Sequence, residues 1–133
     1  MPVDPETFKK TLGCWASGVT IVTSQFEGQR LGMTVSAFSS VSLSPPLVLV
    51  CADKASNTHS LIQKSRAFTV NVLSTDQSAL SNLFADKKRE AIRFDGLDCA
   101  TGATGCPRLP GALSALDCHV RDEIDAGDHV VYI

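Results

Sequence analysis

The sequence lacks the motifs that mark the commonest nucleotide, metal and hydrolase sites. Neither Gly-x-Gly-x-x-Gly nor Gly-x-x-x-x-Gly-Lys-Ser/Thr occurs, which excludes the usual Rossmann and P-loop phosphate sites. His-Glu-x-x-His is missing and the three histidines are scattered, so we expect no metal site. Gly-x-Ser-x-Gly, the nucleophile elbow of many serine hydrolases, is also missing. Any nucleotide must therefore be held by another scaffold.

Positive charge and long apolar runs are also scarce. The net charge of −2 leaves no evident basic face, which argues against binding of nucleic acid. The longest strongly apolar run, residues 47–52, is too short to span a membrane, and residues 1–4 do not resemble a signal peptide. The five cysteines form an odd number without Cys-x-x-Cys, which favours reduced thiols. We therefore expect a cytoplasmic protein.

The 133 residues suit one domain, and their pattern is mainly that of strands. β-branched or alternating residues predict strands at 19–23, 31–41, 47–52, 68–72, 116–121 and 129–133. Capping residues predict helices that begin near Asp4, Ser56 and Ser74. Residues 86–112 look irregular. Since the short helices separate strands that need not be parallel, a mostly antiparallel barrel with helical excursions fits best.

Two polar segments suggest an anion site. Residues 34–40 form a hydroxyl-rich strand, and the loop at 53–58 leads into a helix start. Hydroxyls and free amides at a helix start bind phosphate well, and Lys54 can add a compensating charge. The alternative from the residues alone is a serine-rich edge strand beside an ordinary capped helix.

Residues 32–48 resemble the signature segment of the flavin reductase family with the FMN-binding split-barrel fold. The similarity covers nearly the whole chain, including residues 16–23, 56–59, 68–73, 93–96 and 127–129. The resemblance implies a mainly β, mostly antiparallel Greek-key split barrel with short peripheral helices over residues 1–133. Family members usually continue beyond the Gly-Asp-His block, so it also implies a domain shortened at the C-terminus, with an open sheet edge at its last strand.

The resemblance also assigns site residues. It places along the flavin ring and ribityl chain the residues Thr34, Val35, Ser36, Ala37 and Phe38. It places at the border of the same groove Cys51, Ala52 and Asp53, and at the phosphate Ser56, Asn57 and Thr58. Phe94 is expected to cover the cofactor, with core packing as its alternative. His129 matches the position associated with nicotinamide binding, its alternative being a histidine hydrogen-bonded to the preceding turn.

The implied activity is hydride transfer from NAD(P)H to FMN or FAD, with reduced flavin passed to a partner monooxygenase. Split-barrel flavoproteins of this kind resemble one another in forming homodimers with flavin near the interface. The resemblance therefore implies a homodimer. The sequence leaves two alternative functions open: a flavin-binding electron carrier without NAD(P)H-dependent turnover, and a cofactor-free assembly protein. The sequence does not separate FMN from FAD or NADH from NADPH.

Overall fold

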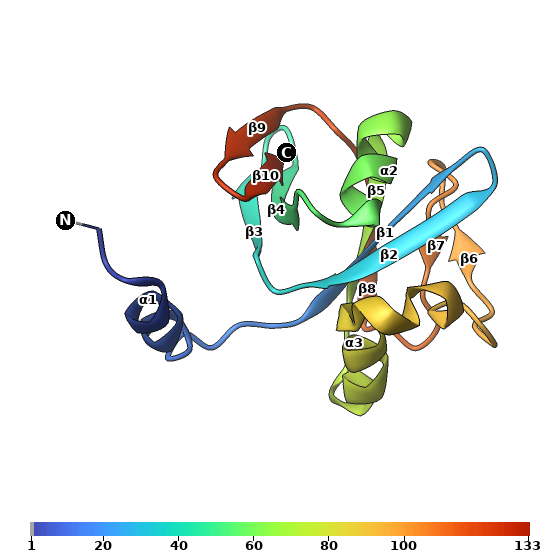
Figure 1. Cartoon of the computed structure of the whole chain (residues 1–133). Coiled ribbons are helices and arrows are strands. Elements are labelled where there is room, and N and C mark those ends of the chain that lie inside the picture. Colours follow the sequence, from blue (N-terminus) through green and yellow to red (C-terminus); the bar gives the residue numbers. More distant parts are fainter. Residues whose placement is uncertain (1) are drawn as a thin grey trace.

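Two four-stranded antiparallel sheets enclose the main core of the computed structural model, which describes residues 2–133 (Figure 1). The first sheet has the order β2-β1-β5-β8, with β1 Thr20–Phe26, β2 Gln29–Val35, β5 Ala67–Val72 and β8 Ser114–His119. The second has the order β3-β4-β10-β9, with β3 Phe38–Ser42, β4 Leu47–Asp53, β9 Glu123–Ala126 and β10 His129–Tyr132. A small third sheet pairs β6 Ala100–Thr101 with β7 Pro107–Arg108. The predicted mainly β, antiparallel class is thus confirmed.

The helices are short and lie outside the sheets. They are α1 Pro5–Leu12, α2 Asn57–Ser65 and α3 Ser78–Ala85, with the 3-10 helices η1 Thr75–Gln77 and η2 Lys87–Ile92. The side chain of Asp4 caps α1 by accepting from the Thr7 amide at 2.9 Å, and Ser56 caps α2 from the His59 amide at 3.1 Å. These two predicted helix starts are confirmed. No helix within residues 2–133 is long and apolar enough to cross a bilayer.

Three features differ from the sequence-based expectation. The extended segment predicted at 31–41 is broken at Ser36 and Ala37, so that β2 and β3 join different sheets. Residues 86–112 contain η2, β6 and β7. The open edge predicted at the last strand is wrong, because β10 pairs with β4 on one side and with β9 on the other. A tight turn at Gly127, with φ of 68°, folds β9 back onto β10.

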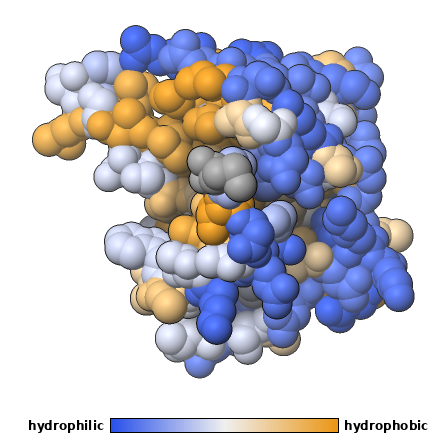
Figure 2. Space-filling model, turned by 60° about the vertical axis from the view of Figure 1, so that its left-hand side comes forward, coloured by the Kyte–Doolittle hydropathy of each residue, from blue (hydrophilic) through white to orange (hydrophobic). Residues whose placement is uncertain are grey.

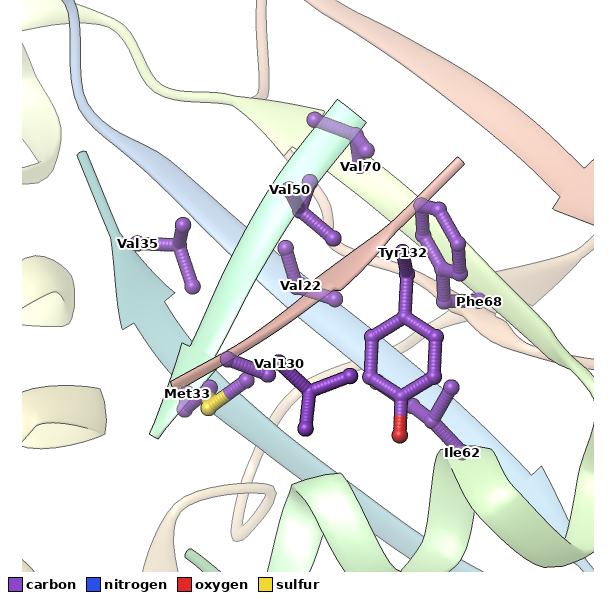
Figure 3. Packing of buried hydrophobic residues seen from close by; sticks show 10 residues of the cluster. Val22, Met33, Val35, Val50, Ile62, Phe68, Val70, Val130 and Tyr132 are labelled. Atoms are coloured by element: carbon purple, nitrogen blue, oxygen red, sulfur yellow. The ribbon is translucent and has the colours of Figure 1, made fainter. Parts of the chain in front are cut away.

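The main core lies between the two sheets and under α2 (Figure 3). Figure 3 labels Val22, Met33, Val35, Val50, Ile62, Phe68, Val70, Val130 and Tyr132. The ring of Tyr132 is fully buried, and its hydroxyl lies 2.7 Å from Nδ1 of His59 on α2. This hydrogen bond connects β10 to the helix whose first turn forms part of the candidate site.

Candidate active site

A cavity of about 250 Å³ lies where β2, the start of α2 and the α3–η2 segment meet. Its lining residues are Met33, Thr34, Asp53, Ala55, Ser56, Asn57, Phe84, Ala85, Lys87, Glu90 and Arg93. The structure therefore brings the hydroxyl-rich strand, through Thr34, to the polar loop, through Ser56 and Asn57. This juxtaposition is the arrangement that the anion-site hypothesis requires.

The first turn of α2 is fixed by hydrogen bonds within its own loop. The Asp53 carboxylate accepts from the Ala55 amide at 2.8 Å, and the Asp53 carbonyl accepts from the Ser56 amide and hydroxyl at 3.0 and 2.8 Å. The first amides of a helix have no partner within the helix. Ser56 satisfies that of His59, so those of Asn57 and Thr58 remain for a ligand or water. An anion beside this turn is favoured by the free amides and by the helix dipole.

Thr58, which the resemblance assigns to the phosphate, has a buried hydroxyl without a partner among the described residues. Its side chain is 1% exposed, and its hydroxyl is the buried side-chain group within residues 2–133 that has no hydrogen-bond partner. Leaving a buried hydroxyl unpaired costs about 1–3 kcal/mol, so such atoms usually have a function. Thr58 is not among the cavity-lining residues, so its assignment to the phosphate stays a prediction.

Arg93 supplies the cation of the cavity, and the sequence reasoning missed it. Its guanidinium is almost fully buried and donates to the carbonyls of Gly32 at 2.8 Å, Asp86 at 2.9 Å and Leu83 at 3.3 Å. Burial lowers the pKa of Arg93 while the nearby acidic groups raise it, and an arginine stays charged at neutral pH in either case. In the sequence its only signal is its place in the Arg-Phe-Asp-Gly segment, next to Phe94.

The two lysines near the site take different positions. Lys54, expected to compensate the phosphate charge, forms an ion pair with Asp125 and lines a separate hollow beside His59. Lys87, in η2, lines the cavity instead. The loop that carries Lys54 is drawn toward β10, since the Lys54 amide donates to the Asp128 carbonyl at 3.1 Å. The compensating charges of the cavity are thus Arg93 and Lys87.

The positions assigned to the flavin ring lie at the break between β2 and β3. Ser36 and Ala37 are exposed there, Phe38 is half-buried, and the Cys51 amide donates to the Ala37 carbonyl at 3.0 Å. Burial raises the pKa of the half-buried Cys51 thiol. Val35 and Ala52 are core residues, so their side chains face away from any ligand on this surface. These ring contacts stay predictions.

His129 and Phe94 fall in different surroundings. His129 opens β10 directly opposite Asp53, which lines the cavity, and its Nδ1 lies 2.7 Å from the Asp128 carboxylate. That bond lowers the pKa of Asp128 and orients the imidazole. Phe94 packs edge-on against Phe84 at 5.2 Å between ring centroids, and it is not among the cavity-lining residues. Its contacts favour the core-packing alternative.

Comparison with known proteins shows the family of the chain. The family model described as "Flavin reductase like domain" matches residues 12–133. The chain is 37% identical to FMN reductase (NADH) RutF of Escherichia coli O45:K1, over 96% of the chain and 77% of that protein. It is 39% identical to the reductase component of 4-nitrophenol 4-monooxygenase/4-nitrocatechol 2-monooxygenase of Rhodococcus opacus, over 99% of the chain and 70% of that protein.

A solved structure resembles the whole fold. The NADH:FAD oxidoreductase SgcE6 of Streptomyces globisporus C-1027, in complex with NAD and FAD fragments, superposes with a TM-score of 0.88 at 34% identity. The superposition covers 99% of this chain and 81% of that one. Among curated relatives the share of the other protein that is matched is as low as 42%. The chain belongs to the flavin reductase family of split-barrel proteins.

Proposed function

We propose that this chain is an NAD(P)H-dependent flavin reductase that transfers a hydride to FMN or FAD. The observation that carries the proposal is the cavity in which Thr34, the amide-rich start of α2 and the buried Arg93 converge. Relatives named FMN reductase (NADH) and a related NADH:FAD oxidoreductase support both the hydride donor and the acceptor.

The chain's own residues bind and orient, because hydride transfer requires close and aligned approach of the two rings. The amides at the start of α2, the Thr58 hydroxyl and the Arg93 guanidinium would hold the flavin phosphate. The ring would lie against the exposed residues Ser36 and Ala37, beside Cys51. When bound, the flavin supplies the redox chemistry as hydride acceptor. No side chain of the cavity needs to act as a strong acid or base.

His129 is our proposed residue for the nicotinamide side. It lies on the strand next to Asp53, and Asp128 fixes its ring, so the imidazole can present its second nitrogen to a ligand near the flavin. A positioning contact of this kind contributes about 1.4 kcal/mol, or tenfold in affinity. We expect His129→Ala to raise the KM for NADH or NADPH about tenfold while the Kd for FMN stays unchanged.

Anaerobic stopped-flow mixing of the flavin-loaded chain with NADH or NADPH measures this directly through bleaching of the flavin absorbance. Flavin bound to the wild-type chain should bleach. The His129→Ala variant should need about tenfold more NADH or NADPH to reach the same bleaching rate. Loaded chain that fails to bleach with either nucleotide would be an electron carrier. A colourless chain that quenches no flavin fluorescence would be an assembly protein, and the proposal would be lost.

We further propose that reduced flavin passes to a partner monooxygenase, as the name of the Rhodococcus opacus relative suggests. We also propose a cytoplasmic location. The reaction consumes NAD(P)H, which the cytoplasm supplies, and the five free cysteines suit a reducing compartment.

A homodimer is also proposed, and the N-terminal arm supports it. In Figure 1, α1 stands away from the two sheets at the end of an extended segment. Phe8, Leu12 and Trp15 lie 51, 54 and 78% exposed along this arm, and Figure 2 shows apolar side chains gathered on one part of the face seen from this side. Exposed apolar surface of this kind favours a protein partner. Light scattering should give the dimer mass, and a monomer mass with and without flavin would contradict the proposal.

A further inference from the structure

Glu90 and Asp53 are the two acidic residues that line the cavity. The Asp53 carboxylate accepts the Ala55 amide of its own loop, whereas the Glu90 carboxylate contacts the groups that would bind an anion. Its Oε1 accepts a hydrogen bond from Nδ2 of Asn57 at 2.7 Å, and its Oε2 lies 3.6 Å from Nη1 of Arg93. The Glu90 side chain therefore links η2 to the first turn of α2. Both groups that it contacts belong to the phosphate side of the candidate site.

A phosphate in this cavity must meet Glu90 at close range. A phosphomonoester carries about −1.5 to −2 charges at neutral pH, and like charges only a few ångströms apart repel strongly where water is partly excluded. The Glu90 side chain is 29% exposed, so solvent screens it only in part. A glutamine would give Asn57 the same acceptor without a charge. The hydrogen bond to Asn57 therefore does not explain why this position carries a negative charge.

We propose that Glu90 sets the affinity of the site for phosphorylated flavins by competing with the phosphate for Asn57 and Arg93. This inference rests on the proposed function and adds a residue that controls release. A reductase that passes its product on must let go of reduced flavin, and a carboxylate held against the phosphate partners lowers the affinity. Riboflavin, which has no phosphate, escapes this competition.

The test compares FMN and riboflavin binding to wild-type chain and Glu90→Gln by quenching of flavin fluorescence. We expect the Kd for FMN to fall about threefold to tenfold in Glu90→Gln, and the Kd for riboflavin to stay the same. The difference should shrink as salt is added, because mobile ions screen the repulsion. Slower dissociation of FMN should account for most of the gain.

Glu27→Gln is the matched control, since it removes one negative charge at the exposed turn between β1 and β2. It should leave the Kd for FMN unchanged. Equal affinity of wild-type chain and Glu90→Gln for FMN, or an equal gain for riboflavin, would overturn the role of Glu90 while leaving flavin reduction intact. Failure of the wild-type chain to bind either flavin would instead remove the proposed function and this inference together.

Discussion

Replacing Arg93 by methionine is expected to lower the free energy of unfolding by about 3–5 kcal/mol, because it removes a buried guanidinium that donates three hydrogen bonds and lies beside the Glu90 carboxylate. Carbonyls on β2, near the end of α3 and just before η2 lose the hydrogen bond from Arg93 at once, although those of Leu83 and Asp86 keep a backbone amide donor. Arg93 thereby fastens the α3–η2 wall of the cavity to the sheet. The variant should also bind FMN at least tenfold more weakly, since the phosphate loses its buried cation. Urea unfolding and fluorescence quenching measure the two effects.

Two further variants distinguish the fastening role from the loss of a positive charge. Arg93→Lys keeps the charge but lacks the planar fork that reaches three carbonyls, so its stability should lie between those of wild type and Arg93→Met. Arg89→Met, within η2 and four residues before Arg93, removes an exposed arginine paired with Asp86 at 3.0 Å and should cost less than about 1 kcal/mol. If Arg93→Met were as stable as Arg89→Met, the proposed fastening would be refuted.

The parts of the fold that follow local rules could be predicted from the sequence. The β-branched run of β1 and the alternating residues of β5 follow the period of a strand. Asp4 and Ser56 mark helix starts because a side-chain oxygen satisfies an amide only a few residues away. The amide-rich start of α2 was foreseeable for the same reason, and it forms one side of the site.

Features set by contacts between distant segments could not be predicted from the sequence. The break at Ser36 and Ala37 separates two strands of similar composition, and only their pairing with β1 and β4 reveals it. β9 was missed because its acidic residues indicated a turn. Arg93 could not be recognised as buried, since arginine is rarely buried and its three acceptors lie up to 61 residues away.

Gly32 illustrates how such distant contacts constrain a single position. A Cβ atom built at this residue would lie 2.8 Å from the Phe84 ring of α3, closer than real Cβ contacts. The glycine lets α3 lie directly on β2, where Phe84 lines the cavity and the Gly32 carbonyl receives Arg93. The sequence alone shows Gly32 only as one small residue in an extended segment.

The buried contact between β10 and α2 leads to an expected dependence of stability on pH. Tyr132 is the only tyrosine of the chain and is fully buried, and this burial raises the pKa of its phenol above the ordinary value, with the charge of Glu123 adding to the effect. A raised folded-state pKa means that the contribution to stability is complete below about pH 10 and is lost as the pH rises toward the folded value. The free energy of unfolding should therefore decline above about pH 10, by at most about 1.4 kcal/mol per pH unit from this group.

Tyr132→Phe should remove that part of the alkaline decline, although at neutral pH it leaves His59 without its partner and costs about 1–3 kcal/mol. Because no other tyrosine is present, the ultraviolet absorbance of tyrosinate reports this group alone. The absorbance should rise together with loss of the folded state, followed by circular dichroism in the same samples. Tyrosinate that formed in the folded chain near the ordinary pKa would show that water reaches the phenol, and the hydrogen bond to His59 would then not hold the first turn of α2 to β10.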